Sequence, residues 1–315
     1  MTQKKLCKIV LSTVVAMFPL QVLCAQDLTP RAYTITPIHS NAITLTYSLN
    51  TGEILVADSI PISDFSTTLH IPVFSYYHSL AFFGRSANIV ASLPYAVGNF
   101  EGKVSSVSQS VYRSGLTDSA FRFSVNLIGG PAMSLEEIRK WRQKSLLGVS
   151  IKLVAPTGQY DPTKLVNLSA NHWGFKPELG YSGRRGHVVL DAYGGMWLFT
   201  TNSEFFSRNA SFPGSRTLSQ KPVASFEGHL SYDVRPLFWI SLDGNFWYGG
   251  RTSRNGVENG STLQTSSRIG ATVSFPLSTH QSLKFSYSDG AYVRLGGNYQ
   301  NVSVAWQYSW VGRPN

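Results

Sequence analysis

Ten titratable side chains stand at alternate positions of short stretches whose other residues are large and apolar. Alternate residues of an extended chain share one face, so these side chains would lie on the polar faces of strands. Charges of both signs gathered in this way can form a constriction that selects solutes by charge and size. They can equally pair with one another and stabilise a closed interior. The ten candidates are Arg122, Lys152, Lys176, Glu178, Glu227, His229, Asp233, Asp243, Arg268 and Lys284.

Catalysis and metal binding find little support in the sequence. His39 and Ser40 could suggest a lipid-modifying pair. However, neighbouring residues on a strand point to opposite faces, whereas a nucleophile and its base must meet at about 3 Å. His70 and His78 share a strand face, but eight residues of strand span about 26 Å. We therefore expect no catalytic residues, no metal site and no cofactor.

The elements that carry these residues show the period of two that is typical of strands. The last of them alternates Val302, Val304, Trp306, Tyr308 and Trp310 with small or polar residues. Such a final aromatic strand also fits the C-terminal signal that the outer-membrane assembly machinery reads. The other stretches are residues 43–49, 69–77, 87–95, 121–127, 147–153, 173–181, 188–200, 226–232, 238–248, 269–275 and 283–287, with the register of 69–77 and 188–200 left open.

About twelve strands of this kind predict an all-β fold, an antiparallel transmembrane β-barrel. Each stretch is close to the roughly 9–11 residues that cross a bilayer at a tilt. Only 14% of the residues are charged, against about 25% in a typical soluble domain. In such a barrel the apolar residues would face lipid and the polar residues the lumen. A water-soluble sandwich with the same strands is the alternative.

The connections give a second argument for a bacterial outer-membrane barrel, in which short turns lie in the periplasm and long loops outside. Long and short connections mostly alternate along the sequence, a pattern that is not expected for a soluble sandwich. The long ones are residues 50–67, 98–118, 156–171, 201–221 and 249–261, and the short ones are 82–85, 183–186, 235–236 and 276–281.

The first 25 residues have the pattern of a secretory signal: three lysines, a mostly apolar run and a small residue, Ala25, before the expected cleavage. Residues 26–315 would then form the barrel domain. Cys7 and Cys24 both fall in the signal, so the mature chain would have no disulfide or thiol nucleophile. Its 24 basic and 17 acidic residues are scattered singly, which argues against a nucleic-acid partner.

One short-side connection looks like a helix. Ser134 and Glu137 fit a capping box, and Leu135, Ile138 and Trp141 would share one face. We expect a small amphipathic helix over the periplasmic rim of the barrel. A plug or a membrane-surface anchor is the alternative.

The connection at residues 156–171 begins with PTGQYD, which is rich in turn formers. Gln159, Tyr160 and Asp161 could fold inward from the extracellular side and gate the pore. The alternative is an ordered loop that packs on its neighbours.

The sequence PTGQYDPTKLVNLSANHWGFKPELGY (residues 156–181) resembles a bacterial family of outer-membrane proteins linked to the meta-cleavage pathway of phenol degradation and labelled transporters. Similar stretches span the mature chain, among them PRAYTITPIHSN (30–41) and HQSLKFSYSDGAYVRLGGNY (280–299). His172 stands where the family pattern has Arg or Lys. The resemblance implies a barrel integral to the bacterial outer membrane that passes small, hydrophobic or aromatic solutes passively. A structural or ligand-binding barrel with a closed lumen is the second possibility, and a lipid-modifying barrel enzyme the third.

Overall fold

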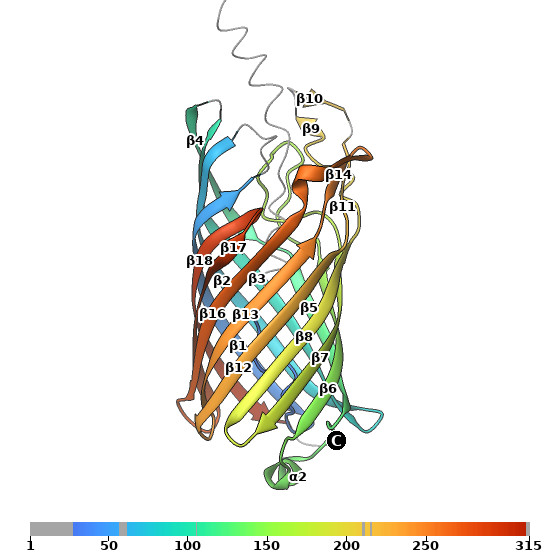
Figure 1. Ribbon diagram of the computed structural model, residues 1–315, viewed down its shortest axis with the longest axis vertical. Coiled ribbons are helices and arrows are strands. Elements are labelled where there is room, and N and C mark those ends of the chain that lie inside the picture. Colours follow the sequence, from blue (N-terminus) through green and yellow to red (C-terminus); the bar gives the residue numbers. More distant parts are fainter. Residues whose placement is uncertain (1–27, 57–61, 105, 210–211, 215, 313–315) are drawn as a thin grey trace, which may run out of the picture.

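The computed structural model describes residues 28–56, 62–104, 106–209, 212–214 and 216–312, and the signal expected at residues 1–25 lies outside them. The described residues form a closed antiparallel barrel of twelve strands (Figure 1), which confirms the predicted fold class. The barrel strands are β1 (Ser40–Leu55), β2 (Ile62–Phe82), β3 (Arg85–Val104), β5 (Ser119–Ile128), β6 (Ser145–Ala155), β7 (Gly174–Arg185), β8 (Val188–Phe199), β12 (Val223–Arg235), β13 (Phe238–Gly249), β16 (Gln264–Pro276), β17 (Gln281–Val293) and β18 (Gly296–Val311).

The barrel closes where the first strand meets the last. β1 pairs with β18 from Ser40↔Val311 to Leu55↔Gly296 without a register shift. Closure leaves no sheet edge at membrane depth, so every backbone group there can find a partner.

The predicted alternation of faces is confirmed along most strands. On β13, Ile240, Leu242 and Phe246 are exposed on the outside, while Ser241 and Asp243 are buried inside. Because the outer residues are large and apolar over a band of the barrel, this face is the one that meets lipid.

The expectation that apolar residues avoid the lumen is wrong for several aromatic side chains. Trp197 and Trp247 are fully buried inside the barrel, where they pack with Val154 and Val223. Trp197 lies on β8, the stretch in which both faces looked apolar. Its neighbours Leu190 and Leu198 are exposed on the outer face, so the inward Trp197 accounts for the ambiguous pattern.

Several strands are longer than the expected 9–11 residues. β2 has 21 residues and β3 has 20. Residues 98–118, predicted to be a connection, form the end of β3 and an additional strand, β4 (Val107–Leu116), which pairs with it. β4 and β5 follow each other along β3 with a break at Thr117, whose N–H donates to the carbonyl of Pro94.

The remaining elements lie in the connections. The extracellular loops carry β9 (Arg208–Asn209), β10 (Phe212–Pro213), β11 (Leu218–Gln220), β14 (Thr252–Arg254), β15 (Val257–Asn259) and the 3-10 helix η2 (Gly260–Thr262). The opposite end carries α2 (Leu135–Lys140), with the predicted capping box of Ser134 and Glu137. In Figure 1 it lies just outside the rim with the short turns. No helix among the described residues is long and apolar enough to cross a membrane.

The segment before β1 lies inside the barrel, a feature that the sequence did not suggest. Residues 28–38, the "N-terminal segment", contact strands on widely separated parts of the wall. Arg31 reaches Asp191 of β8 and Asp233 of β12, and Thr36 bonds Tyr77 of β2. The segment therefore occupies part of the lumen.

Candidate functional site: the charged lumen

The predicted lumen charges meet in a belt around the inner wall. Lys176 Nζ lies 2.8 Å from Glu178 Oε2 and 2.8 Å from Glu227 Oε1. Arg122 adds a second cation, 3.3 Å from Glu178 Oε1. Period two places Lys176 and Glu178 on the same face of β7. Arg122 comes from β5 and Glu227 from β12, each separated from β7 by one strand. The side chains of Lys176, Glu178 and Glu227 are all more than nine-tenths buried, so each charge depends on its partners.

The belt continues onto β12 and β13. His229 and Asp243 are directly opposite each other in the register, and His229 Nδ1 lies 2.9 Å from Asp243 Oδ1. The hydroxyls of Ser241 and Thr272 donate to Asp243 at 2.9 Å and 2.7 Å. His229 Nε2 lies 3.7 Å from Glu227 Oε2, which links the two halves of the belt.

The other four predicted residues also face inward but lie apart from the belt or at its margin. Lys152 stands across from Lys176 in the register, with Nζ 5.6 Å from the centre of the Trp197 ring. Lys284 lies on the inner face of β17 opposite Ser274. Asp233 sits at the periplasmic end of β12, where Arg31 and Arg184 both pair with it.

Arg268 is 2% exposed and occupies a separate place in the upper lumen. Its guanidinium donates to the carbonyl of Tyr299 at 3.0 Å and lies 4.5 Å from the centre of that ring. This contact combines a hydrogen bond with a cation–π interaction. The side chain is therefore held against the wall.

The N-terminal segment is joined to the belt through Tyr33. The Tyr33 hydroxyl donates to Glu178 Oε1 at 3.0 Å and lies 3.1 Å from Ser150 Oγ. The guanidinium of Arg122 lies 4.8 Å from the centre of the Tyr33 ring and donates to the carbonyl of Ala32. Two of the predicted lumen charges thus hold the segment.

A pair of glycines makes room for this tyrosine. Gly148 of β6 and Gly180 of β7 are directly opposite in the register. A Cβ on Gly180 would lie 2.0 Å from the Tyr33 ring, and one on Gly148 would lie 2.4 Å from it. No side chain fits at either position while Tyr33 keeps its place. The glycines were the one sequence signal for an inserted ring.

The lower part of the segment is held near the periplasmic end. Arg31 Nη2 lies 2.6 Å from Asp233 Oδ1, and its guanidinium lies 4.5 Å from the centre of the Trp239 ring. The backbone N–H of Arg31 donates to Asp191 at 3.1 Å. Below this, His39 is bonded through its backbone to Ser79 and Gly312, so the segment is tethered at the periplasmic mouth.

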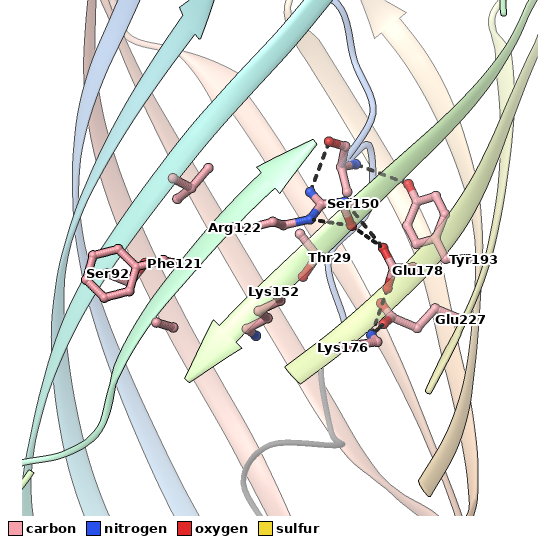
Figure 2. Close-up of a pocket in the computed structure, with 13 residues that line it drawn as sticks. Thr29, Ser92, Phe121, Arg122, Ser150, Lys152, Lys176, Glu178, Tyr193 and Glu227 are labelled. Carbon is pink, nitrogen blue, oxygen red and sulfur yellow. Dashed lines mark hydrogen bonds and ion pairs between the residues drawn. The ribbon is translucent and has the colours of Figure 1, made fainter. Parts of the chain in front are cut away.

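Between the segment and the wall lies a cavity of about 220 Å³. Figure 2 shows Ser92 and Phe121 on one side of it and the charged groups on the other. The inward side chains on the first flank are Val90, Ser92 and Ala120, so this flank is apolar or weakly polar, and the other carries the belt. The cavity is lined by Thr29, Ala32, Val90, Ser92, Ala120, Phe121, Arg122, Ser150, Lys152, Lys176, Glu178, Tyr193 and Glu227.

The predicted gating residues lie in an ordered extracellular loop. The Tyr160 hydroxyl donates to the carbonyl of Glu204 at 3.2 Å and accepts from Asn202 at 2.9 Å, and burial raises the pKa of Tyr160. The backbone N–H of Gln159 donates to Leu116. Hydrogen bonds from Thr163, aided by Lys164, lower the pKa of Asp161 to about 2.

The same loop reaches toward both sides of the barrel mouth. Val166 packs against a cluster formed by Ile54 of β1, Leu69 of β2 and Phe100 of β3. The preceding residue, Leu165, packs against Phe205 and Phe206, which follow β8. Three strands, β5, β6 and β7, separate β3 from β8 around the wall. The loop therefore lies over this part of the opening.

The alternative chemistries gain no geometric support. Among the described residues, no group of three or more His, Asp or Glu side chains could hold a metal ion. His70 bonds the Tyr47 hydroxyl on the outer face, and His78 bonds Asn41. Ser40 is buried and accepts no hydrogen bond from His39 within the described part of the chain.

Comparison with solved structures shows a fold shared with an outer membrane channel. An outer membrane channel from Pseudomonas putida F1 superposes with a TM-score of 0.72 at 16% sequence identity, over 90% of this chain and 100% of that chain. The toluene transporter TodX from Pseudomonas putida gives a TM-score of 0.45 at 10% identity, over 87% of this chain and 90% of that one. No curated protein matches the chain.

The closed barrel, its lipid-facing apolar band and this shared fold make the protein an integral barrel of the bacterial outer membrane. A family profile matches residues 50–306, from within β1 to within β18. This match confirms the resemblance seen in the sequence, and the chain belongs to the family described as "Putative MetA-pathway of phenol degradation".

Proposed function

We propose that the protein is a passive outer-membrane channel for small apolar or aromatic solutes. The observation that carries this proposal is the lumenal cavity between the N-terminal segment and the wall. One flank of it presents Val90 and Ala120 to a solute, while the belt keeps the opposite flank polar. The family description supports aromatic compounds as the substrate class.

The N-terminal segment sets the width of this path. It is fixed at the periplasmic mouth and bonded to the wall at Arg31 and Tyr33. A narrow lumen restricts passage by size and leaves little room for hydrated polar solutes. The belt charges near the segment are paired, so their first role is to hold the wall and segment together, and Lys152 at the margin of the cavity is the candidate for selectivity.

Single-channel conductance of the refolded mature protein in a planar bilayer tests the proposal. We expect discrete steps that added phenol partly blocks, because the solute would occupy the cavity through which ions pass. A silent bilayer containing protein that is folded by its heat-modifiable gel mobility would contradict an open channel.

That silent result is the expectation of the second candidate function, a ligand-binding barrel with a closed lumen. The N-terminal segment favours this alternative, because the Tyr33 ring, the Arg31 guanidinium and the backbone at Ala32 fill space inside the barrel. In that case phenol would still bind the folded protein, measured by calorimetry, without any conductance.

We further propose that the loop carrying Gln159, Tyr160 and Asp161 acts as the extracellular gate. Its packing on both sides of the mouth through Leu165 and Val166 supports this role. Replacing residues 159–167 with a flexible linker is expected to increase conductance, whereas unchanged conductance would mean that the loop only packs on its neighbours.

We also infer that β18 is read by the assembly machinery through Val302, Val304, Trp306, Tyr308 and Trp310. Val302 and Tyr308 are exposed on the outer face of β18, in the strand that completes the barrel. Residues 1–25 are proposed to be removed as a signal, which N-terminal sequencing of the mature protein would test.

A further inference from the structure

The periplasmic end of the barrel carries an unusual concentration of positive charge. The last turn of α2 and the segment that follows it hold four exposed cations within six residues: Arg139, Lys140, Arg142 and Lys144. Arg142 also donates to the carbonyls of Arg139 and Trp141. That bond fixes the course of the segment, so the four cations are displayed on an ordered stretch of chain.

The neighbouring turns extend this charge along the rim. The carbonyl of Lys144 accepts from the backbone N–H of Arg184, which places the segment beside the β7–β8 turn. The β7–β8 turn also contacts the end of β12, through a hydrogen bond between His187 Nδ1 and the carbonyl of Asp233. The exposed cations of these three connections, here called the basic arc, are Arg139, Lys140, Arg142, Lys144, Arg185 and Arg235.

Two nearby carboxylates already have other partners, and a third, Glu136, is exposed in the first turn of α2. Asp233 pairs with Arg31 and Arg184. Glu137 accepts from the Ser134 N–H at 2.7 Å and from its hydroxyl at 2.9 Å, and these bonds lower the pKa of Glu137. Within the described chain, the arc cations form no ion pair with a carboxylate. Their charge is therefore available to an external anion.

The opposite rim has the contrary arrangement. Several cations near the extracellular rim pair with carboxylates of neighbouring strands or loops, as in Lys103–Asp64 and Lys221–Glu258. Arg251 shares Glu258. These extracellular cations each have a carboxylate beside them, unlike the cations of the basic arc, which points to an anionic partner at the periplasmic end.

Exposed apolar side chains stand along the same rim. Phe83 is 89% exposed in the β2–β3 turn, and Leu237 is 71% exposed two residues after Arg235. The β2–β3 turn is held to the segment before α2 by the Ala132 N–H, which donates to Gly84. Ile128 and Leu135 add further exposed apolar surface. Basic groups beside apolar ones are typical of chain that lies at the headgroup level of a bilayer.

We propose that the basic arc binds the phosphate headgroups of anionic phospholipids in the inner leaflet of the outer membrane. The cations lie on three connections that contact one another along the rim, and apolar side chains are exposed on the same rim. This arrangement matches a bilayer surface, in which headgroup phosphates lie above acyl chains. The helix α2 then acts as the anchor that presents the first part of the arc.

Native mass spectrometry tests the proposal. The folded mature protein is released from detergent micelles doped with equal amounts of dioleoylphosphatidylglycerol and dioleoylphosphatidylcholine. We expect the wild type to retain roughly threefold more phosphatidylglycerol than phosphatidylcholine, because several cations each attract the anionic lipid. The rim variant Arg139→Gln/Lys140→Gln/Arg142→Gln/Lys144→Gln should retain the two lipids equally.

The matched control, Lys103→Gln/Lys164→Gln/Lys221→Gln/Arg251→Gln, removes the same number of charges from the extracellular rim and should behave as the wild type. Equal retention by the wild type, a preference that survives in the rim variant, or equal loss in the control would each overturn the proposal. If the rim variant does not fold, the wild type decides the question: its preference must fall as the ammonium acetate concentration rises, since screening weakens surface charge.

Discussion

The Tyr33 hydroxyl donates to Glu178 Oε1 at 3.0 Å, and this bond joins the segment inside the lumen to the charged wall. The ring of Tyr33 is 1% exposed and lies over two opposed glycines. The Tyr33 ring therefore packs directly against the backbone of the wall at these two glycines.

Gly180→Ala is expected to displace the segment and raise the single-channel conductance. Its Cβ would lie 2.0 Å from the Tyr33 ring, a distance that real Cβ atoms do not adopt, so the ring must leave. Gly228→Ala is the control, because a Cβ there meets no atom within 4 Å. Equal conductance in the two variants would mean that the segment does not limit the path.

Lys176→Met is expected to destabilise the barrel by about 3–5 kcal/mol, because it leaves two buried carboxylates without their shared cation. Glu178 and Glu227 both lie 2.8 Å from the Lys176 ammonium. The urea midpoint, followed by heat-modifiable mobility, measures the loss. Adding Glu227→Gln should recover part of it, since one of the two charges is then removed, and no recovery would argue against a coupled group.

Lys152→Glu is expected to shift ion selectivity toward cations. Lys152 lines the cavity, so reversing its sign changes the field along the proposed path. The reversal potential under a salt gradient measures the effect, with Lys103→Glu on the extracellular rim as the control. An unchanged potential would remove Lys152 from the conduction path.

The loop at Asp161 is expected to stay ordered until strongly acidic pH. The pKa of Asp161 is lowered to about 2 in the folded protein, against about 3.9 for an unperturbed aspartate. A depressed pKa contributes stability that is present above the unfolded value and is lost as pH falls through the folded one. Amide exchange at Thr163 and Asn167, corrected for intrinsic rates, should therefore accelerate between about pH 4 and pH 2.

The variant Asp161→Asn should show faster exchange already at neutral pH and no further acid step, because it cannot become charged. An acid step that persists in this variant would assign the transition to another group.

Trp310→Ala is expected to lower insertion into the outer membrane of cells while leaving refolding in detergent intact. Trp310 belongs to the aromatic face of β18 and contacts the Tyr308 ring, with 5.8 Å between ring centres. Tyr292→Ala, which removes an exposed aromatic of β17, is the control. Equal insertion of both variants would contradict a signal carried by β18.

The sequence predicted the barrel well because its lipid-facing residues obey a strict local rule. At membrane depth an outward position must be apolar. Residues such as Ile240 and Leu242 therefore indicate a strand from the local sequence alone. The capping box at Ser134 was found for the same reason, since its two bonds span three residues.

The inner face follows no such rule, and the predictions were weaker there. Trp197 and Trp247 are tolerated inside the barrel because they belong to one hydrophobic cluster, which shields them from water. The long ends of β2 and β3 were missed because beyond the bilayer their sequence carries polar residues on both faces.

The position of the N-terminal segment could not be foreseen from the strand pattern, although the glycines at 148 and 180 leave room for an inserted ring. Tyr33 and Ser150 are 117 residues apart in the sequence, and only the closed barrel brings them together. Likewise, the ten charges could be assigned to the inner face from their spacing, but the pairing of Lys176 with Glu227 depends on the order of strands around the wall.

The length of the β2–β3 hairpin has a consequence outside the lumen. The 21 residues of β2 span about 70 Å along the strand, whereas the apolar band of such a barrel is only about 25 Å tall. Even when tilted, the outer ends of β2 and β3 extend well past the lipid headgroups, stiffened by the pairing of β3 with β4 (Figure 1). These strands form a rigid projection outside the membrane, which antibodies and phage fibres could contact although they are far too large to enter the lumen.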